Sequence, residues 1–233
     1  MISPRCRPKE YDSSMKETHI NKFNNVYSSA NYYYGLELRH EFTDYFADKN
    51  IKGFVALDLG AGEGRYALYL ANRGCTVAAI DRSNVGIKKM IEKSEELKLG
   101  IQALAVDIAD FKFAANYYDI VVAATILDHL PDKLRFETAS RIKHALKPGG
   151  ILYVNVFTVL DPGYASHPGT TGGGRQNVSD TADCIEHYFN PGELRHLFGG
   201  LEILHEYEGI EPDISHGTPH HHGWACLLAK KLI

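Results

Sequence analysis

From residue 54 to about residue 158, short runs of mainly apolar residues alternate with longer segments of helical periodicity. Runs that are apolar throughout are typical of parallel strands covered on both faces, and their alternation with helical segments predicts βαβ units. The sequence therefore predicts an α/β fold with a doubly wound, mainly parallel sheet. The expected strands of this region are Phe54–Leu59, Thr76–Ile80, Ile101–Val106, Asp119–Ala124 and Ile151–Phe157.

Helical segments are expected between most of these strands, at Arg65–Arg73, Asn84–Leu99 and Asp132–Leu146. Pro131 suits an early helical position, and the segment Lys147-Pro148-Gly149-Gly150 is expected to close the third helix. The crossover over residues 109–118 is too short to predict a helix. Beyond the core, a short helix is expected at about Pro191–Phe198, followed by strand-like runs at Leu201–Tyr207 and Gly223–Leu232 with a histidine-rich connection between them.

The two flanks of the core have a different character. Residues 1–50 are polar and aromatic and contain a helical pattern at Leu36–Ala47, so we expect an N-terminal helical cap at 1–50 and a main domain at 51–233. The stretch from about Thr158 to Tyr188 has little periodicity and contains Gly172–Gly174. Its length exceeds that of most structureless loops in compact domains, and we interpret it as a lid over the substrate site.

Composition narrows the class of protein. Apolar residues make up 44% and charged residues 23%, which is ordinary for a globular chain. The net charge of -4 and the pI near 6.3 give no basic footprint for nucleic acid. The chain contains no run of about 18 apolar residues that would predict a membrane span, and the basic N-terminus lacks an apolar signal region. We expect a cytoplasmic protein with no nucleic-acid or membrane partner, either a monomer or a homodimer.

Four cysteines are widely scattered and form no CxxC pair of the kind that indicates zinc or redox chemistry. Reduced, mostly packed thiols are therefore expected at Cys6, Cys75, Cys184 and Cys226.

The first expected strand runs directly into a glycine-rich segment, Asp58-Leu59-Gly60-Ala61-Gly62-Glu63-Gly64-Arg65. Glycines allow the backbone to turn tightly and to approach a ligand closely. The spacing is D-x-G-x-G-x-G, whereas a dinucleotide fingerprint that starts at Gly60 needs glycine where Arg65 stands. This departure counts against a nicotinamide-dependent oxidoreductase. A non-catalytic module that binds a nucleotide is another function compatible with the loop.

Acidic residues stand at the ends of the first three expected strands, and open α/β sheets bind ligands outside these strand ends. Asp58 suits the amino-acid portion of S-adenosylmethionine, Asp81 suits the two ribose hydroxyls, and Asp107 suits an adenine amino group with Ile108 against the ring. Each aspartate taken singly is also compatible with capping the helix that follows it.

These segments resemble the core of the class I S-adenosylmethionine-dependent methyltransferases. The pieces that carry the resemblance are Leu57-Asp58-Leu59-Gly60-Ala61-Gly62-Glu63-Gly64, Ala79-Ile80-Asp81, Val106-Asp107-Ile108, Tyr118-Asp119-Ile120-Val121 and Leu146-Lys147-Pro148-Gly149-Gly150. The resemblance implies a Rossmann-like seven-stranded sheet with an antiparallel last strand. It implies S-adenosyl-L-methionine as the cofactor, bound by Asp58, Gly60, Ala61, Gly62, Asp81, Arg82, Asp107, Ile108 and Thr125.

Within that superfamily, the chain from about Tyr32 is most similar to the tellurite-resistance methyltransferase branch. The compact crossover after Asp107, the helix start Phe189-Asn190-Pro191-Gly192-Glu193-Leu194 and the terminal Ala229-Lys230-Lys231 carry this closer similarity. It implies methyl transfer by in-line displacement to a small nucleophile: a thiol, a chalcogen oxyanion, a hydroxyl or an amine. After the fourth expected strand the chain reads Ala124-Thr125-Ile126-Leu127 and lacks the Pro-Pro-aromatic motif of base-modifying amino-methyltransferases.

Several aromatic and histidine residues are candidates for catalysis or for substrate binding. His129 follows the fourth expected strand and either acts as a general base or starts the next helix. Tyr33 and Tyr34 either close over the ligand or pack the N-terminal helices. The histidines from His216 to His222 are compatible with three interpretations, namely a substrate pocket containing His220 and His222, a metal site, or a plain hairpin. The sequence alone assigns no metal ligand, because neighbouring strand residues face opposite sides and no cysteine pair completes the set.

Overall fold

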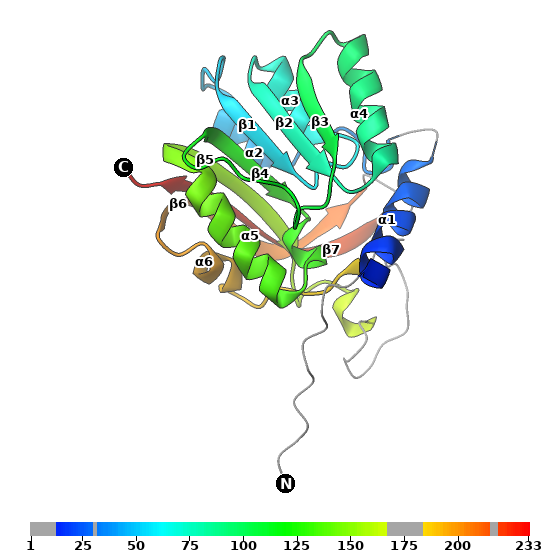
Figure 1. The fold of residues 1–233 in the computed structure, drawn as a ribbon. Helices are drawn as coiled ribbons and strands as arrows, with labels where there is room; N and C mark the ends of the chain where they lie inside the picture. Colours follow the sequence, from blue (N-terminus) through cyan, green and yellow to red (C-terminus); the bar gives the residue numbers. More distant parts are fainter. Residues whose placement is uncertain (1–12, 30–31, 167–183, 215–218) are drawn as a thin grey trace.

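The computed structural model describes residues 13–29, 32–166, 184–214 and 219–233. Its centre is a seven-stranded sheet of order β3-β2-β1-β4-β5-β7-β6 (Figure 1). Strands β1 to β5 pair in parallel, and β7 lies antiparallel to both β5 and β6. The strands are β1 (Val55–Leu59), β2 (Thr76–Asp81), β3 (Ile101–Ala105), β4 (Tyr118–Ala124), β5 (Leu146–Phe157), β6 (Leu201–Asp213) and β7 (His220–Lys231). The predicted α/β fold with an antiparallel last strand is confirmed.

Helices cover both faces of the sheet because side chains alternate along the buried strands. In β4, Val121 and Ala123 face one apolar core while Ile120 and Val122 face the other. The first core contains residues of α5 and α6, and the second contains residues of α2, α3 and α4. The described helices are α1 (Ser13–Tyr27), α2 (His40–Phe46), α3 (Arg65–Asn72), α4 (Asn84–Glu96), α5 (Asp132–Ala145) and α6 (Glu193–Leu197), with short 3₁₀ turns at η1 (Leu127–His129) and η2 (Tyr164–Ser166).

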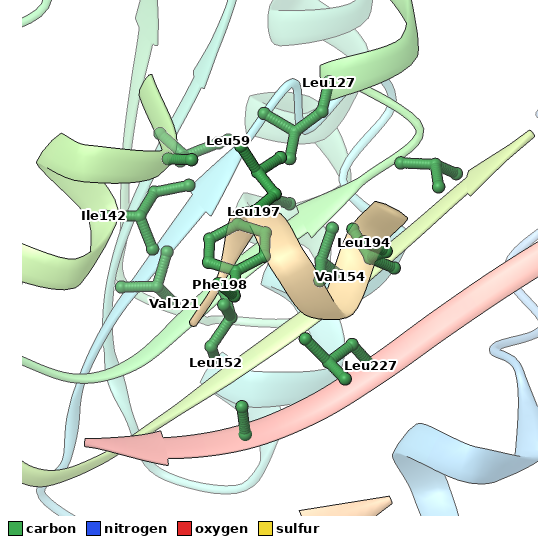
Figure 2. Close-up of a cluster of buried hydrophobic side chains, with 14 of the residues drawn as sticks. Leu59, Val121, Leu127, Ile142, Leu152, Val154, Leu194, Leu197, Phe198 and Leu227 are labelled. Atoms are coloured by element: carbon green, nitrogen blue, oxygen red, sulfur yellow. The ribbon is translucent and has the colours of Figure 1, made fainter. Parts of the chain in front are cut away.

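Figure 2 shows the core between the sheet, α5 and α6. Branched aliphatic side chains of four strands meet the inner sides of the two helices there, as expected for strands that are apolar on both faces. This packing fixes the carboxyl ends of β1, β4 and β5 relative to one another. The residues labelled in the figure are Leu59, Val121, Leu127, Ile142, Leu152, Val154, Leu194, Leu197, Phe198 and Leu227.

The N-terminal segment contributes α1, which lies against α4. The Ser83 hydroxyl connects the two helices: it caps α4 by accepting a hydrogen bond from Gly86 N at 3.1 Å, and it donates to Asn24 Oδ1 of α1 at 2.6 Å. Helix α2 packs deeper, since Phe42 and Phe46 belong to the second core. The domain division at residue 50 stays a prediction. None of the described helices is long and apolar enough to span a membrane.

Two boundaries predicted from sequence were wrong. Residues 147–150 lie inside β5 and do not close α5, because β5 begins at Leu146, which pairs with Tyr118 ahead of an irregularity in the register. The histidines at 220–222 lie inside β7 and not in a connection, because β6 continues to Asp213 and pairs with β7 as far as His220. Gly172–Gly174, the middle of the expected lid, and His216 lie outside the described residues.

Candidate active site

A cavity opens at the carboxyl ends of β1, β2 and β4, where open α/β sheets bind ligands. One half of its wall is the loop from Asp58 to Tyr66 together with the ends of β2 and β4. The other half comes from β5, β7 and the end of β6, and the segments around Tyr27 and Tyr34 complete the wall. The cavity therefore joins the glycine loop predicted to bind the cofactor to residues from distant parts of the chain.

The glycine loop after β1 requires glycine at the positions that the sequence pattern singled out. Gly60 and Gly62 have φ values of 66° and 54°, which side chains rarely allow. A Cβ atom on Gly60 would also lie 2.9 Å from the Ile126 side chain, and one on Gly62 would lie 2.7 Å from the Tyr27 hydroxyl. The backbone at these positions thus forms part of the cavity wall without side chains in the way.

Two buried carboxylates fix this loop by accepting hydrogen bonds from backbone amides. Asp81 accepts hydrogen bonds from Gly62 N at 2.8 Å and Ser83 N at 2.7 Å. Asp58 accepts from Ala67 N at 3.0 Å, in the first turn of α3. Both residues line the cavity, and because an ionised carboxylate offers about four acceptor positions, each keeps capacity for a ligand.

Burial dominates the electrostatics of these two carboxylates. It raises the pKa of the Asp58 carboxyl to about 7, although the Ala67 amide and the nearby Arg65 oppose the shift. Burial likewise raises the pKa of Asp81 above its usual range, against hydrogen bonds from the Ser83 and Gly62 amides. A cationic ligand group placed here would favour the charged forms.

Of the residues that follow β3, some line the cavity and one predicted cofactor residue does not. Val106 and Ile108 line the cavity, and Ile108 is buried. Asp107 is not among the residues that line the cavity. Its carboxylate accepts a hydrogen bond from Ala109 N at 2.8 Å and lies 4.0 Å from Arg82 Nη2. Arg82 does line the cavity, and its Nη1 atom lies 3.2 Å from Nδ1 of His19 on α1.

The segment after β4 supplies Thr125 and His129 to the cavity. Thr125 has a φ of 47°, a strained backbone for a β-branched residue and one that is common at functional sites. His129 is buried, and its Nδ1 atom lies 2.9 Å from the Cys184 carbonyl oxygen. Burial lowers the pKa of His129, although the neighbouring Asp128 and the Cys184 carbonyl oppose that shift. The imidazole is therefore neutral at neutral pH.

The N-terminal segment contributes aromatic rings, in part as predicted. Tyr34 lines the cavity, whereas Tyr33 packs edge-on against Tyr34 and its backbone amide donates to Glu63. Tyr27 and Phe23 of α1 also line the cavity, and sequence reasoning did not identify them. The polar and aromatic composition of residues 1–50 gave no signal that would have separated these two rings from their neighbours.

The half of the cavity formed by β5 and β7 combines stacked aromatic rings with polar groups. Phe157 and Trp224 stack with ring centroids 4.4 Å apart, and the His222 ring lies 4.9 Å from that of Phe157. Asn155 is fully buried, and neither polar atom of its amide has a hydrogen-bond partner within the described residues. A signal for Asn155 was present in the sequence, because it is the one polar residue in the run Ile151–Phe157.

His222 lines this half, as expected for a substrate residue, while His220 stands behind it and is not in the lining. The Nε2 atoms of the two rings are 2.9 Å apart. Asp161, also missed from the sequence, lies 2.7 Å from Nδ1 of His222. The described cysteines Cys75, Cys184 and Cys226 are buried, as expected.

Comparison with known proteins agrees with this geometry. Residues 56–150 match the family described as Methyltransferase domain. The chain is 31% identical over 160 residues to a ubiquinone biosynthesis O-methyltransferase of Coxiella burnetii, covering 66% of this chain and 66% of that protein. It is also 31% identical over 104 residues to the 2-heptyl-1-hydroxyquinolin-4(1H)-one methyltransferase of Mycobacteroides abscessus, covering 43% of this chain and 45% of that protein. The alignments thus span just under two thirds of the first relative and under half of the second.

Solved structures share the fold. The crystal structure of TehB from Haemophilus influenzae, a tellurite-resistance methyltransferase, is similar with a TM-score of 0.67 and 20% identity over 91% of this chain and 67% of that chain. The N-methyltransferase NodS from Bradyrhizobium japonicum WM9, in complex with S-adenosyl-L-homocysteine, gives a TM-score of 0.64 and 14% identity over 91% of this chain and 98% of that chain. Residues 56–150 thus carry a methyltransferase domain, and the resemblance of the chain to S-adenosylmethionine-dependent methyltransferases that was found in its sequence is confirmed.

Proposed function

We propose that this protein transfers the methyl group of S-adenosylmethionine to a small-molecule acceptor bound against β5 and β7. The observation that carries the proposal is that one cavity joins the glycine loop to the wall containing Asn155, Phe157 and Trp224. The cofactor would occupy the half that contains the glycine loop, which we call the cofactor half. Its sulfonium group would be directed toward the half formed by β5, β7 and the end of β6, which we call the acceptor half. Holding the acceptor in line with the methyl group, away from water, is then the main source of rate acceleration.

Each cofactor residue has a proposed role that its position supports. The Gly60–Gly62 backbone would approach the amino-acid portion of S-adenosylmethionine, and Asp58 would face the ammonium group of that portion. Asp81 would accept hydrogen bonds from the two ribose hydroxyls. Ile108 would pack against the adenine ring. Because Asp107 is outside the cavity lining, its proposed contact with the adenine amino group requires a side-chain movement.

Among the candidate acceptors we place a hydroxyl first, because one relative carries O-methyltransferase in its name. The acceptor oxygen forms a bond to the methyl carbon while the carbon–sulfur bond breaks, and the electron pair of that bond stays on sulfur. A neutral hydroxyl must lose its proton to a base. His129 is suited to this role, since its Nδ1 atom is directed to the Cys184 carbonyl and its neutral Nε2 atom remains an acceptor.

Binding of S-adenosylhomocysteine tests the proposal without knowledge of the acceptor. We expect saturable binding in calorimetry, and Asp81→Ala should weaken it by about 1–3 kcal/mol because buried donors lose their partner. The matched control is Asp110→Ala, an exposed carboxylate outside the cavity, which should leave affinity unchanged. Binding of NAD with no binding of either sulfur cofactor would overturn the proposal.

The role of His129 needs an acceptor screen over phenols, thiols, amines and chalcogen oxyanions. With a hydroxyl acceptor, His129→Gln should lower kcat by about 100-fold or more, the usual contribution of a general base. With an acceptor that is already anionic, the same variant should retain most of its rate. Equal losses with both kinds of acceptor would assign His129 to positioning and not to proton transfer.

A further inference from the structure

A second cluster of functional groups lies at the end of the β6–β7 hairpin. The strand register places Asp213 directly opposite His220. His222, two residues further along β7, has its side chain on the same face as that of His220, and His221 between them faces the other way. Strand pairing alone thus brings two imidazoles and one carboxylate to one face of the sheet.

The ligand atoms of these three side chains converge. His220 Nε2 lies 2.9 Å from His222 Nε2, and His222 Nε2 lies 3.8 Å from Asp213 Oδ2. One ligand atom from each residue falls within 4.8 Å of the others. Metal-bound nitrogen and oxygen atoms at about 2.0–2.2 Å from a common ion are separated by comparable distances.

Asp161 supports this cluster from behind. Its Oδ2 atom lies 2.7 Å from Nδ1 of His222 and also accepts from Gly223 N at 3.0 Å, while Oδ1 accepts from Gly163 N at 2.7 Å. His222 therefore carries its hydrogen on Nδ1 and directs the lone pair of Nε2 toward the cluster. A carboxylate behind a ligating histidine is the usual outer-shell arrangement of metal sites, where it fixes the ring and increases its basicity.

Local packing supports the same arrangement. A Cβ atom on Gly223 would lie 2.3 Å from the backbone nitrogen of Asp161, so glycine is needed for the Asp161 loop to approach β7. His222 and Asp161 are both buried, and the stacked rings of Phe157 and Trp224 adjoin His222. Such apolar walls exclude water from around the histidine.

We propose that Asp213, His220 and His222 bind one divalent transition-metal ion, with Asp161 as the outer-shell partner of His222. Two histidines and one carboxylate form the ligand set of catalytic zinc sites and of non-haem iron sites that keep open coordination positions. Asp213 and His222 line the cavity, so an open position would face the acceptor half. Resting on the proposed function, the ion would bind the acceptor oxygen and favour its deprotonated form.

The single tryptophan of the chain provides a direct reporter of binding. Trp224 lies 5.2 Å from the His222 ring, measured between ring centroids. Protein treated with a chelator should show saturable quenching of tryptophan fluorescence by Co²⁺, with one ion per chain, and Zn²⁺ should compete. This measurement needs neither cofactor nor acceptor, so it is independent of methyl transfer.

Variants connect the signal to the cluster. His220→Ala and Asp213→Asn should each weaken Co²⁺ binding by at least about 100-fold, and Asp161→Asn by about 10- to 100-fold. His221→Ala is the matched control and should leave the titration unchanged. Affinity for S-adenosylhomocysteine, measured on the same samples, shows that the variants are folded and tests the cofactor proposal separately.

Three outcomes would overturn the metal site. They are no saturable quenching at millimolar Co²⁺, an equal loss of binding in His221→Ala and His220→Ala, and a near-ultraviolet thiolate-to-cobalt absorption band that assigns the ion to cysteines. The first outcome would leave His220 and His222 as a hydrogen-bonded pair, without any consequence for cofactor binding.

Discussion

The cofactor half and the acceptor half of the cavity are encoded in different ways. The wall predicted to hold the cofactor is mostly one continuous segment, Asp58 to Tyr66, completed by the ends of β2 and β4. The wall proposed to hold the acceptor combines Asn155 of β5, Asp213 of β6 and Trp224 of β7, which come from three different strands. The first half depends on backbone conformation at glycines, and the second depends on side chains that meet through strand pairing.

This difference has a mechanistic consequence. A backbone-lined loop recognises a ligand common to many enzymes, and its requirements are few: φ values that glycine allows and nearby carboxylates. A side-chain wall can change with each substitution, while the sheet that carries it stays the same. We therefore expect mutations in the two halves to have separate signatures, in cofactor affinity for the first and in acceptor turnover for the second.

The largest expected effect is on the cofactor half. Gly62→Val combines a β-branched residue at a φ of 54° with a Cβ atom that would lie 2.7 Å from the Tyr27 hydroxyl. Strain of about 1–3 kcal/mol together with displacement of the loop should reduce affinity for S-adenosylhomocysteine by about 100-fold or more. Isothermal calorimetry measures this directly.

Two glycines outside the cavity serve as controls for this variant. Gly53 has a φ of 83° but open space around its Cβ position, so Gly53→Val carries backbone strain alone. Gly100 has open space and no positive φ, so Gly100→Val carries neither. Both should keep full affinity, with a lower melting temperature for the first only. Loss of affinity in Gly53→Val would show that general destabilisation, and not the loop, explains the effect at Gly62.

The sequence predicted most of the fold and the position of the glycine loop, which lines the cavity, because their signals are local. Apolar runs identified the strands to within a few residues, and the D-x-G-x-G-x-G spacing identified the loop. The boundary at Lys147–Gly150 was wrong because Pro and Gly are read as breakers, whereas pairing with β4 extends β5 through them.

The acceptor half was harder to predict because its contacts depend on tertiary pairing. Asp161 and His222 are separated by 61 residues, and only the fold brings them within 2.7 Å. In the cofactor half, the position of Tyr27 beside Gly62 was missed for the same reason, because it depends on the packing of α1 on α4. The histidine run is visible in the sequence, but the common face of His220 and His222 depends on the pairing of β6 with β7 up to His220.

Asn155→Leu, in the acceptor half, should lower turnover and leave cofactor affinity nearly unchanged, whereas Gly62→Val should lower cofactor affinity. The buried amide has no partner within the described residues, so replacing it by an apolar group of similar size should raise stability by about 1 kcal/mol or more. If the amide binds the acceptor, kcat/KM should fall by about 10-fold or more, the cost of one lost hydrogen bond in a buried site. Affinity for S-adenosylhomocysteine should change by no more than a few fold.

Thr138→Val is the matched control for Asn155→Leu. Thr138 is also fully buried, and its hydroxyl has no hydrogen-bond partner in the described part of the chain, but it lies on α5 and is not among the residues that line the cavity. It should gain stability and keep full turnover. If both variants lost turnover equally, the effect would come from packing of the core, and Asn155 would have no part in acceptor recognition.

The smallest expected effect is a pH dependence in cofactor binding. The Asp58 carboxyl has its pKa raised to about 7 by burial, so at pH 6 most chains carry the protonated form and at pH 8 most carry the charged form. Only the charged form pairs with the ammonium group of S-adenosylhomocysteine. Affinity should therefore rise by about tenfold from pH 6 to pH 8, in proportion to the charged fraction.

A variant is needed to separate Asp58 from Asp81, because burial raises the pKa of both carboxyls. In the free protein, the raised pKa means that the folded state holds the proton more tightly than the unfolded chain. The contribution of Asp58 to stability is therefore greatest below about pH 4 and is lost as the pH rises to about 7, opposite to the change in affinity. Asp58→Asn keeps an oxygen for the Ala67 amide but cannot ionise, so it should bind more weakly and lack the tenfold rise of affinity between pH 6 and pH 8. If the affinity of Asp58→Asn still rose with pH while that of His129→Gln did not, the titrating group would be His129, and the ammonium group would have to be placed elsewhere in the cavity.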